Sequence, residues 1–252
     1  METINKKIIM GLDVSTTTIG CSIVLVNETG KRTILKVTHV TPKISSKIKG
    51  IEALFLKKQI FEETFLKNYI DFGITDVVIE EPLLRSNNVG VVSTLLKFNA
   101  LISEGVYNKL GIVPAYISSY DARLYSYPNL LTIRKFDKKG VMYPLTKIKR
   151  AIKNNELVLF GDYSWDVEKK HVMLNHIVDE YPDIEWVYDK NGDLKKESFD
   201  CSDSLICCFG YLNRIENGDM VPKIIQHSDD DENIYYEVDI WGEIYKHKIT
   251  KN

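Results

Sequence analysis

The chain has 252 residues, 44% of them hydrophobic, and a formal net charge of −2 at pH 7. This length and composition suit a packed protein of one large or two small domains and exclude a disordered chain. The small net charge argues against indiscriminate coating of nucleic acid. No apolar run approaches the roughly 18–20 residues of a membrane span, and the first residues lack the apolar region of a secretory signal. We therefore expect a cytoplasmic protein without a membrane partner.

The first part of the chain predicts an antiparallel meander. An apolar run over 7–13 ends in Asp13, a Ser/Thr-rich turn follows, and a second β-branched run continues to residue 24. A third strand is expected over 33–41. Apolar residues at three- and four-residue spacing then predict a long helix over 48–69, which Gly73 ends.

Strands and helices alternate in the next part. A short strand over 74–80 is expected to run parallel to its neighbour, because it is reached from a helix. Ser86–Asn88 can cap a helix whose apolar stripe extends from Val92 to Leu110. A strand over 112–117 and a short helix over 119–125 follow. The order βββαβαβα predicts an α/β fold with a mixed sheet flanked by helices.

The second half is less regular. The segment over about 128–164 has weak periodicity, and we interpret it as an insertion. Four further features are predicted: a helix over 165–181, a hairpin over about 183–197 around Asn191-Gly192, a helix over 199–215, and strands over 221–225 and 234–249. The domain prediction is thus a core over 1–217 and a C-terminal β extension over 218–252.

Acidic residues lie at the ends of three apolar segments that are far apart in sequence. Asp13 lies at the end of the first strand, Glu80 ends the strand over 74–80, and Asp200 and Asp203 lie three residues apart on one helix face. Burying several carboxylates without a counter-charge costs several kcal/mol each, by order of magnitude. Oxygen ligands of this kind suit Mg²⁺ or Mn²⁺. Two alternatives stay open: Asp13 could only accept backbone N–H groups, and Asp200 could be only a helix N-cap.

Basic residues concentrate between Arg123 and Lys153, where Asp137 is the one acid. They are Arg123, Arg134, Lys135, Lys138, Lys139, Lys147, Lys149, Arg150 and Lys153. Interleaved aromatic residues make contact with a phosphate backbone a reasonable interpretation, and a solvated surface insertion is an equal alternative. Cys21, Cys201, Cys207 and Cys208 lie in apolar contexts without paired C-x-x-C spacing, so we expect buried, reduced thiols.

In chain order, these motifs resemble those of the RNase H-like nucleases, and among them the RuvC family of Holliday-junction resolvases. The likeness depends on Ile9-Met-Gly-Leu-Asp13 with Thr18 and Gly20, on Val78-Ile-Glu80, and on Asp200-Cys-Ser-Asp-Ser-Leu205. It covers about 7–122 and 165–215. It implies an RNase H-like mixed sheet, a three-strand antiparallel meander plus parallel strands.

The resemblance also implies a site and an activity. Asp13, Glu80, Asp200 and Asp203 would bind two Mg²⁺ or Mn²⁺ ions per active site, with Lys169 adding positive charge near the phosphate. The expected protein is a two-metal endonuclease that resolves four-way DNA junctions as a homodimer, with the Val92–Leu110 stripe as a candidate dimer face. A chain longer than the minimal core suits a phage- or virus-encoded member.

Two other functions are compatible with parts of the sequence. The segment Gly11-Leu-Asp-Val-Ser-Thr-Thr-Thr-Ile-Gly20 also resembles the phosphate-binding hairpin of the actin and sugar-kinase superfamily. Those ATP-binding proteins have a second, duplicated subdomain, of which this chain shows no sign. A non-catalytic RNase H-like scaffold that binds nucleic acid is the other alternative.

Overall fold

The computed structural model describes residues 6–82, 88–130, 169–218, 223–228, 234–240 and 243–249. The chain divides into two compact units. Unit 1 comprises Met1–Ala122 and Leu174–Tyr211, and unit 2 comprises Arg123–Met173 and Leu212–Asn252. The predicted domain boundary at residue 217 stays a prediction.

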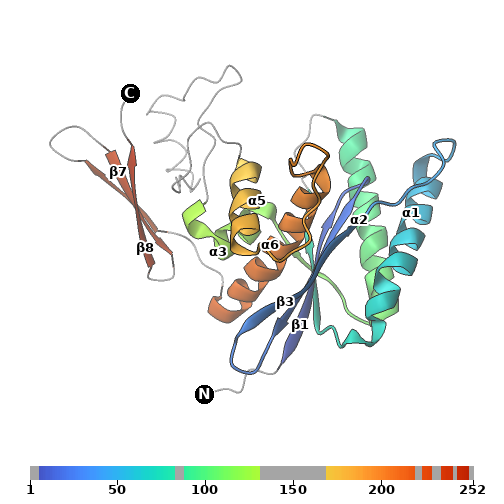
Figure 1. Cartoon of the computed structure of the whole chain (residues 1–252), viewed down its shortest axis with the longest axis horizontal. Helices are drawn as coiled ribbons and strands as arrows, with labels where there is room; N and C mark the ends of the chain where they lie inside the picture. The colour runs from blue at the N-terminus through green and yellow to red at the C-terminus, as the bar shows by residue number, and fades with distance from the viewer. Residues whose placement is uncertain are drawn as a thin grey trace. The chain divides into compact units, whose positions relative to one another are not determined.

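A five-stranded mixed sheet forms the centre of unit 1 (Figure 1). Strands β1 (Lys7–Val14), β2 (Ile19–Val26) and β3 (Arg32–Val40) form the antiparallel meander, and β4 (Asp76–Glu80) and β5 (Ala115–Ile117) continue it parallel to β1. The order is β3-β2-β1-β4-β5. This confirms the predicted RNase H-like mixed sheet.

The helices begin and end close to the predicted residues. The long helix is divided into α1 (Gly50–Thr64) and the 3-10 helix η1 (Leu66–Phe72), after which Gly73 takes φ 74°. Helix α2 (Val89–Leu110) is capped by the Asn88 side chain, which accepts from the Val91 N–H at 3.2 Å. The remaining helices are α3 (Ser119–Ser126), η2 (Pro128–Leu130), α5 (Lys169–Glu180) and α6 (Lys196–Asn217).

Strand alternation divides the sheet into two faces. Met10, Leu12 and Val14 of β1 are buried in one core with Phe61 of α1 and Phe98 of α2. The intervening residues of β1 therefore face the other side, where α6 lies (Figure 1). Asp13 is on this second face, and so is Glu80, because its neighbour Ile79 belongs to the first core.

Helix α2 corrects two sequence-based expectations. Among the described residues, it is the one helix whose length and composition would allow it to cross a membrane. The expectation that no apolar segment approaches this length was therefore wrong. Polar and charged residues within the helix, Lys97 and Glu104 among them, interrupt its apolar sequence, so a search for unbroken apolar runs misses it. However, Phe98, Ile102 and Val106 are fully buried in the core of unit 1. The inner part of the proposed dimer stripe thus packs on its own sheet, as a core helix does.

The predicted hairpin and C-terminal strands are also present. The hairpin is held by a single bridge between Tyr188 and Leu194, with Gly192 at φ 88°. Strands β6 (Lys223–Ser228), β7 (Ile234–Ile240) and β8 (Glu243–Ile249) form a separate antiparallel sheet in the order β6-β7-β8. Most of the predicted insertion over 128–164 lies outside the described residues.

Candidate metal centre

Strand register brings the first two acids together. The parallel pairing of β1 with β4 matches Gly11 with Val78 and Leu12 with Ile79. Asp13 and Glu80 each come one residue later, at the same edge of the sheet and on the same face. Two short apolar strands and their crossover thus place two carboxylates side by side, although 66 residues separate them in the numbering of the chain.

Two glycines in the sheet let α6 approach closely, and this helix carries the third acid of the site. Gly20 pairs with Asp13 across β1 and β2, and a Cβ on Gly20 would lie 1.9 Å from the backbone oxygen of Asp200. A Cβ on Gly11 would lie 2.2 Å from the backbone oxygen of Ser204. The helix therefore rests directly on the strand backbone. A buried hydrogen bond of 2.6 Å between the hydroxyls of Ser22 and Ser204 fixes it there.

We expect Gly20→Ala to lower both stability and metal affinity, because the new methyl group must push the α6 backbone away from β2. The expected loss is about 1–3 kcal/mol of unfolding free energy, the usual cost of overpacking a close contact. Urea unfolding and Mn²⁺ titration calorimetry measure the two effects. Gly90→Ala is the control, since its Cβ would approach only the Asn88 side chain, at 3.3 Å. Equal behaviour of the two variants would contradict the close approach.

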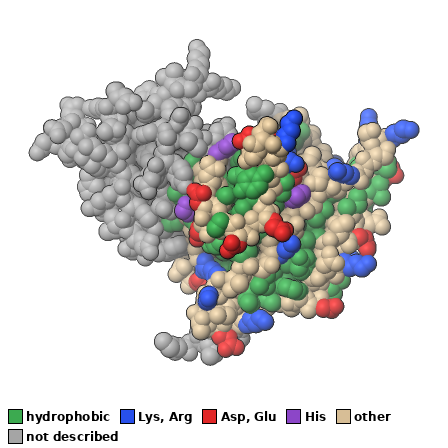
Figure 2. All heavy atoms as spheres, viewed as in Figure 1, with side chains coloured by type: hydrophobic (Ala, Val, Ile, Leu, Met, Phe, Trp, Pro, Cys, Tyr) green, Lys and Arg blue, Asp and Glu red, His purple; other side chains and the backbone are tan. Residues whose placement is uncertain are grey.

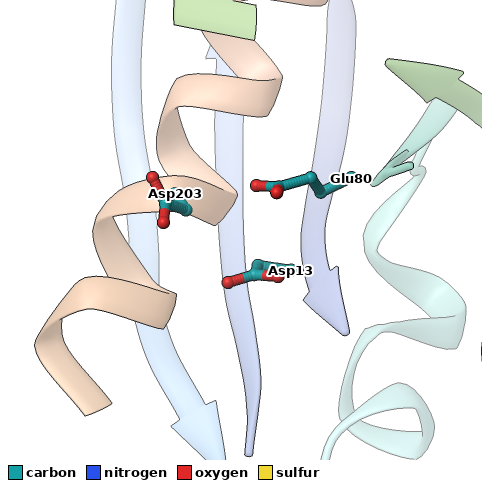
Figure 3. Close-up of side chains that lie close together, drawn as sticks. All are labelled: Asp13, Glu80 and Asp203. Atoms are coloured by element: carbon teal, nitrogen blue, oxygen red, sulfur yellow. The ribbon is translucent and has the colours of Figure 1, made fainter. Parts of the chain in front are cut away.

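Asp13, Glu80 and Asp203 form the acidic cluster, with one carboxylate oxygen from each lying within 4.8 Å of the others. All three side chains are partly buried, and they point toward one another from β1, β4 and α6 (Figure 3). Mutual repulsion opposes such an arrangement unless a cation or protons compensate it. An all-oxygen donor set at this spacing fits Mg²⁺ or Mn²⁺.

Asp200 lies outside the acidic cluster as the structure places it. Its side chain is buried, and its Oδ2 has no hydrogen-bond partner among the described residues. Burial is the main reason that its pKa rises to about 6, with Lys196 opposing the rise and Asp203 adding to it. Such a buried oxygen, one helical turn before Asp203, is unusual, because buried polar atoms normally have a hydrogen-bond partner. The N-cap alternative is wrong, because α6 begins at Lys196.

The cysteines near the cluster are not candidate ligands. All four are free and buried, which confirms the expected reduced thiols. Burial raises the pKa of Cys201 to about 12, and burial likewise raises the pKa of Cys21 and Cys207. Since only a thiolate coordinates metal well, these buried thiols are packing residues, and the carboxylates remain the candidate ligands.

The structure leaves the predicted basic contacts largely undescribed. Lys169 begins α5, but its side chain lies outside the described residues, as do Arg134, Lys135, Lys138 and Lys139 entirely. Arg123 lies on α3 with a half-buried side chain. Glu81, the neighbour of Glu80, is exposed. The proposed roles of Lys169, Arg123 and the other basic residues in nucleic-acid binding stay predictions.

No protein-family model and no curated protein matches the chain in sequence. Similar solved structures include two of Thermus thermophilus RuvC, the second in complex with a Holliday junction substrate. Their identities are 13% and 11% and their TM-scores 0.48 and 0.49, and each comparison covers 84% of this chain and 96% of that chain. The yeast mitochondrial Holliday junction resolvase Ydc2 has 9% identity and a TM-score of 0.44 over 81% of this chain and 77% of that chain.

A member of the Ppx/GppA family from Aquifex aeolicus is also similar, with 12% identity and a TM-score of 0.36 over 84% of this chain and 90% of that chain. At such identities and TM-scores, a structural likeness does not carry over a substrate or an activity. Any function has to be supported by the acidic cluster itself.

Proposed function

We propose that this protein is a metal-dependent endonuclease that cleaves branched DNA and resolves four-way junctions. The supporting observation is the convergence of Asp13, Glu80 and Asp203 from three distant segments, with ligand atoms within 4.8 Å of one another. A purely structural role does not need three carboxylates at one spot, because their repulsion destabilises the fold. Phosphodiester hydrolysis does need such a group of carboxylates, to hold cations at the reacting phosphate.

The proposed site holds two divalent cations. Asp13 would bridge them, Glu80 would bind one, and Asp200 and Asp203 would bind the other. Bound Mg²⁺ supplies an activated water and charge stabilisation at the phosphate. The chain's own contribution is geometric: β1 and β4 fix two ligands through their register, and α6 fixes the others through its seat on Gly11 and Gly20.

Paired incisions across a junction require two active sites, which supports a homodimer as the acting form. Helices α1 and α2 expose apolar side chains that their own core does not use. These are Ile51, Phe55, Val89, Val91 and Leu96. We propose that these residues, rather than the whole Val92–Leu110 stripe, contribute the dimer face.

The test is a substrate panel in Mg²⁺ with labelled four-way junction, linear duplex and flap DNA. We expect the junction to be cleaved at least about tenfold faster than the duplex. A dimer has two active sites at a fixed separation, and a junction presents two strands that can occupy both sites together. EDTA should abolish the reaction and Mn²⁺ should restore it. Cutting of only linear or flap DNA would contradict junction resolution while leaving nuclease chemistry in place.

The ATP-binding alternative gains no specific support from the described residues. They contain one five-stranded mixed sheet and one three-stranded antiparallel sheet, and not two sheets of the same order. Thermal stabilisation by ATP in a protein that cuts no DNA would favour that alternative.

A further inference from the structure

The turn between β1 and β2, residues 15–18, lies directly beside the acidic cluster, since it starts two residues after Asp13. It is rigidly built. The Ser15 N–H and Oγ both donate to the Thr18 carbonyl, at 3.0 and 2.8 Å, and the Thr18 N–H donates back to Ser15 Oγ at 3.0 Å. Thr17 is exposed at its tip, with its hydroxyl 3.2 Å from that of Ser15.

Two lysines reach this turn from opposite faces of the sheet. Lys57 of α1 donates from Nζ to the Thr16 carbonyl at 2.5 Å. Lys196, the first residue of α6, donates from Nζ to Thr17 Oγ1 at 3.5 Å. Helix α1 packs on the first core through Leu54, whereas α6 rests on the other face. The turn is thus bracketed by two ammonium groups.

The partners of these lysines are neutral oxygens. Lys58 is neutralised by Glu62 and Glu104 at 3.0 and 2.7 Å, and Lys67 pairs with Glu63 at 3.5 Å. Within the described ranges, Lys57 and Lys196 form no ion pair, although Lys196 is near enough to Asp200 to oppose the rise of its pKa. An ammonium has three donors, so each lysine keeps charge and N–H groups for an anion.

The surface around them does not offer a broad basic region. Figure 2 shows side chains of both charges interspersed among hydrophobic ones on the face that it displays. The formal net charge of the whole chain is −2. Attraction for a polyanion such as DNA therefore has to come from individual basic side chains near the site. They are needed at this edge of the sheet because the carboxylates of the acidic cluster repel phosphate groups.

We propose that Lys57 and Lys196, with the exposed hydroxyl of Thr17, bind the phosphate backbone of the DNA strand that enters the acidic cluster. This rests on the proposed nuclease function. Lys196, Asp200 and Asp203 share one face of α6. Lys196 precedes Asp203 by about 10 Å along the helix axis, at about 1.5 Å per residue. That is roughly the axial rise of three nucleotides in a B-form strand. The lysines hold phosphates next to the scissile one.

The experiment measures binding of a labelled four-way DNA junction by fluorescence anisotropy across a salt series, with Ca²⁺ in place of Mg²⁺. The variants are Lys57→Gln, Lys196→Gln and the double variant. Lys67→Gln is the control, because Lys67 lies in η1, which precedes β4 and so lies at the opposite edge of the sheet. We expect the slope of log K against log salt to fall by about 0.9 per lysine lost. Affinity at low salt should fall about 3–10-fold per lysine, and Lys67→Gln should change neither quantity.

A second readout separates phosphate binding from support of the turn. Lys57→Arg and Lys196→Arg should restore the salt slope, and Mn²⁺ affinity should stay within about twofold of wild type in Lys57→Gln. A salt slope that the double variant leaves unchanged overturns the proposal, and so does a wild-type protein that binds no junction. Binding is measured without cleavage, so a protein that binds through these lysines but never cuts would refute only the nuclease proposal.

Discussion

Asp13→Asn is expected to abolish DNA cleavage, with a rate at least about 10³-fold below wild type, equivalent to about 4 kcal/mol of transition-state stabilisation. Asp13 belongs to the acidic cluster with Glu80 and Asp203 and is the proposed bridging ligand. An amide keeps the shape of the side chain and loses its charge. The measurement is single-turnover cleavage of a four-way junction in saturating Mg²⁺.

Junction binding separates loss of chemistry from loss of structure. In Ca²⁺, Asp13→Asn should bind the junction within a few-fold of wild type, because its backbone pairing with Gly20 does not involve the carboxylate. Asp71→Asn is the matched control: Asp71 is an exposed acid of η1, at the other edge of the sheet. Cleavage that persists in Asp13→Asn would exclude the assigned metal role, whatever the control does.

The pairing of Asp13 with Glu80 could be predicted from the sequence, because it follows from two local rules. Alternation along a strand sets the face of each residue, and a helical crossover makes the next strand parallel. The common face of Asp200 and Asp203 is local in the same way. None of these inferences required a contact between distant segments to be known in advance.

The parts that could not be predicted depend on non-local contacts. The start of α6 at Lys196 instead of residue 199 carries no apolar signal, because its first residues are charged. Nothing local says that the backbone of Asp200 meets Gly20 or that the Asp200 side chain is buried. Sequence reasoning did not single out Lys57, because its role depends on the turn beside Asp13.

Asp200→Asn is expected to stabilise the metal-free protein at pH 7 while lowering cleavage about 10²–10³-fold, the range seen when one preorganised electrostatic contact at a transition state is removed. Burial raises the pKa of Asp200 to about 6 from a model-peptide value of 3.8. Ionising this carboxylate therefore costs the folded state more than the unfolded one. The amide removes that cost, which is about 1–2 kcal/mol once solvent screening is allowed for.

The direction of the raised pKa determines how the stability of the protein should change with pH. Between pH 3.8 and about 6 the folded protein holds a proton on Asp200 that the unfolded chain releases. Wild-type stability should therefore fall as pH rises through that window and stay low above it. Asp200→Asn should lack this fall, and the exposed-site control Asp183→Asn should keep it. Saturating Mn²⁺ should restore wild-type stability at pH 7, because a cation gives the buried Oδ2 its missing partner. A wild-type urea-unfolding profile that is flat across the window would show that Asp200 titrates normally and would remove the reason for its role as a ligand.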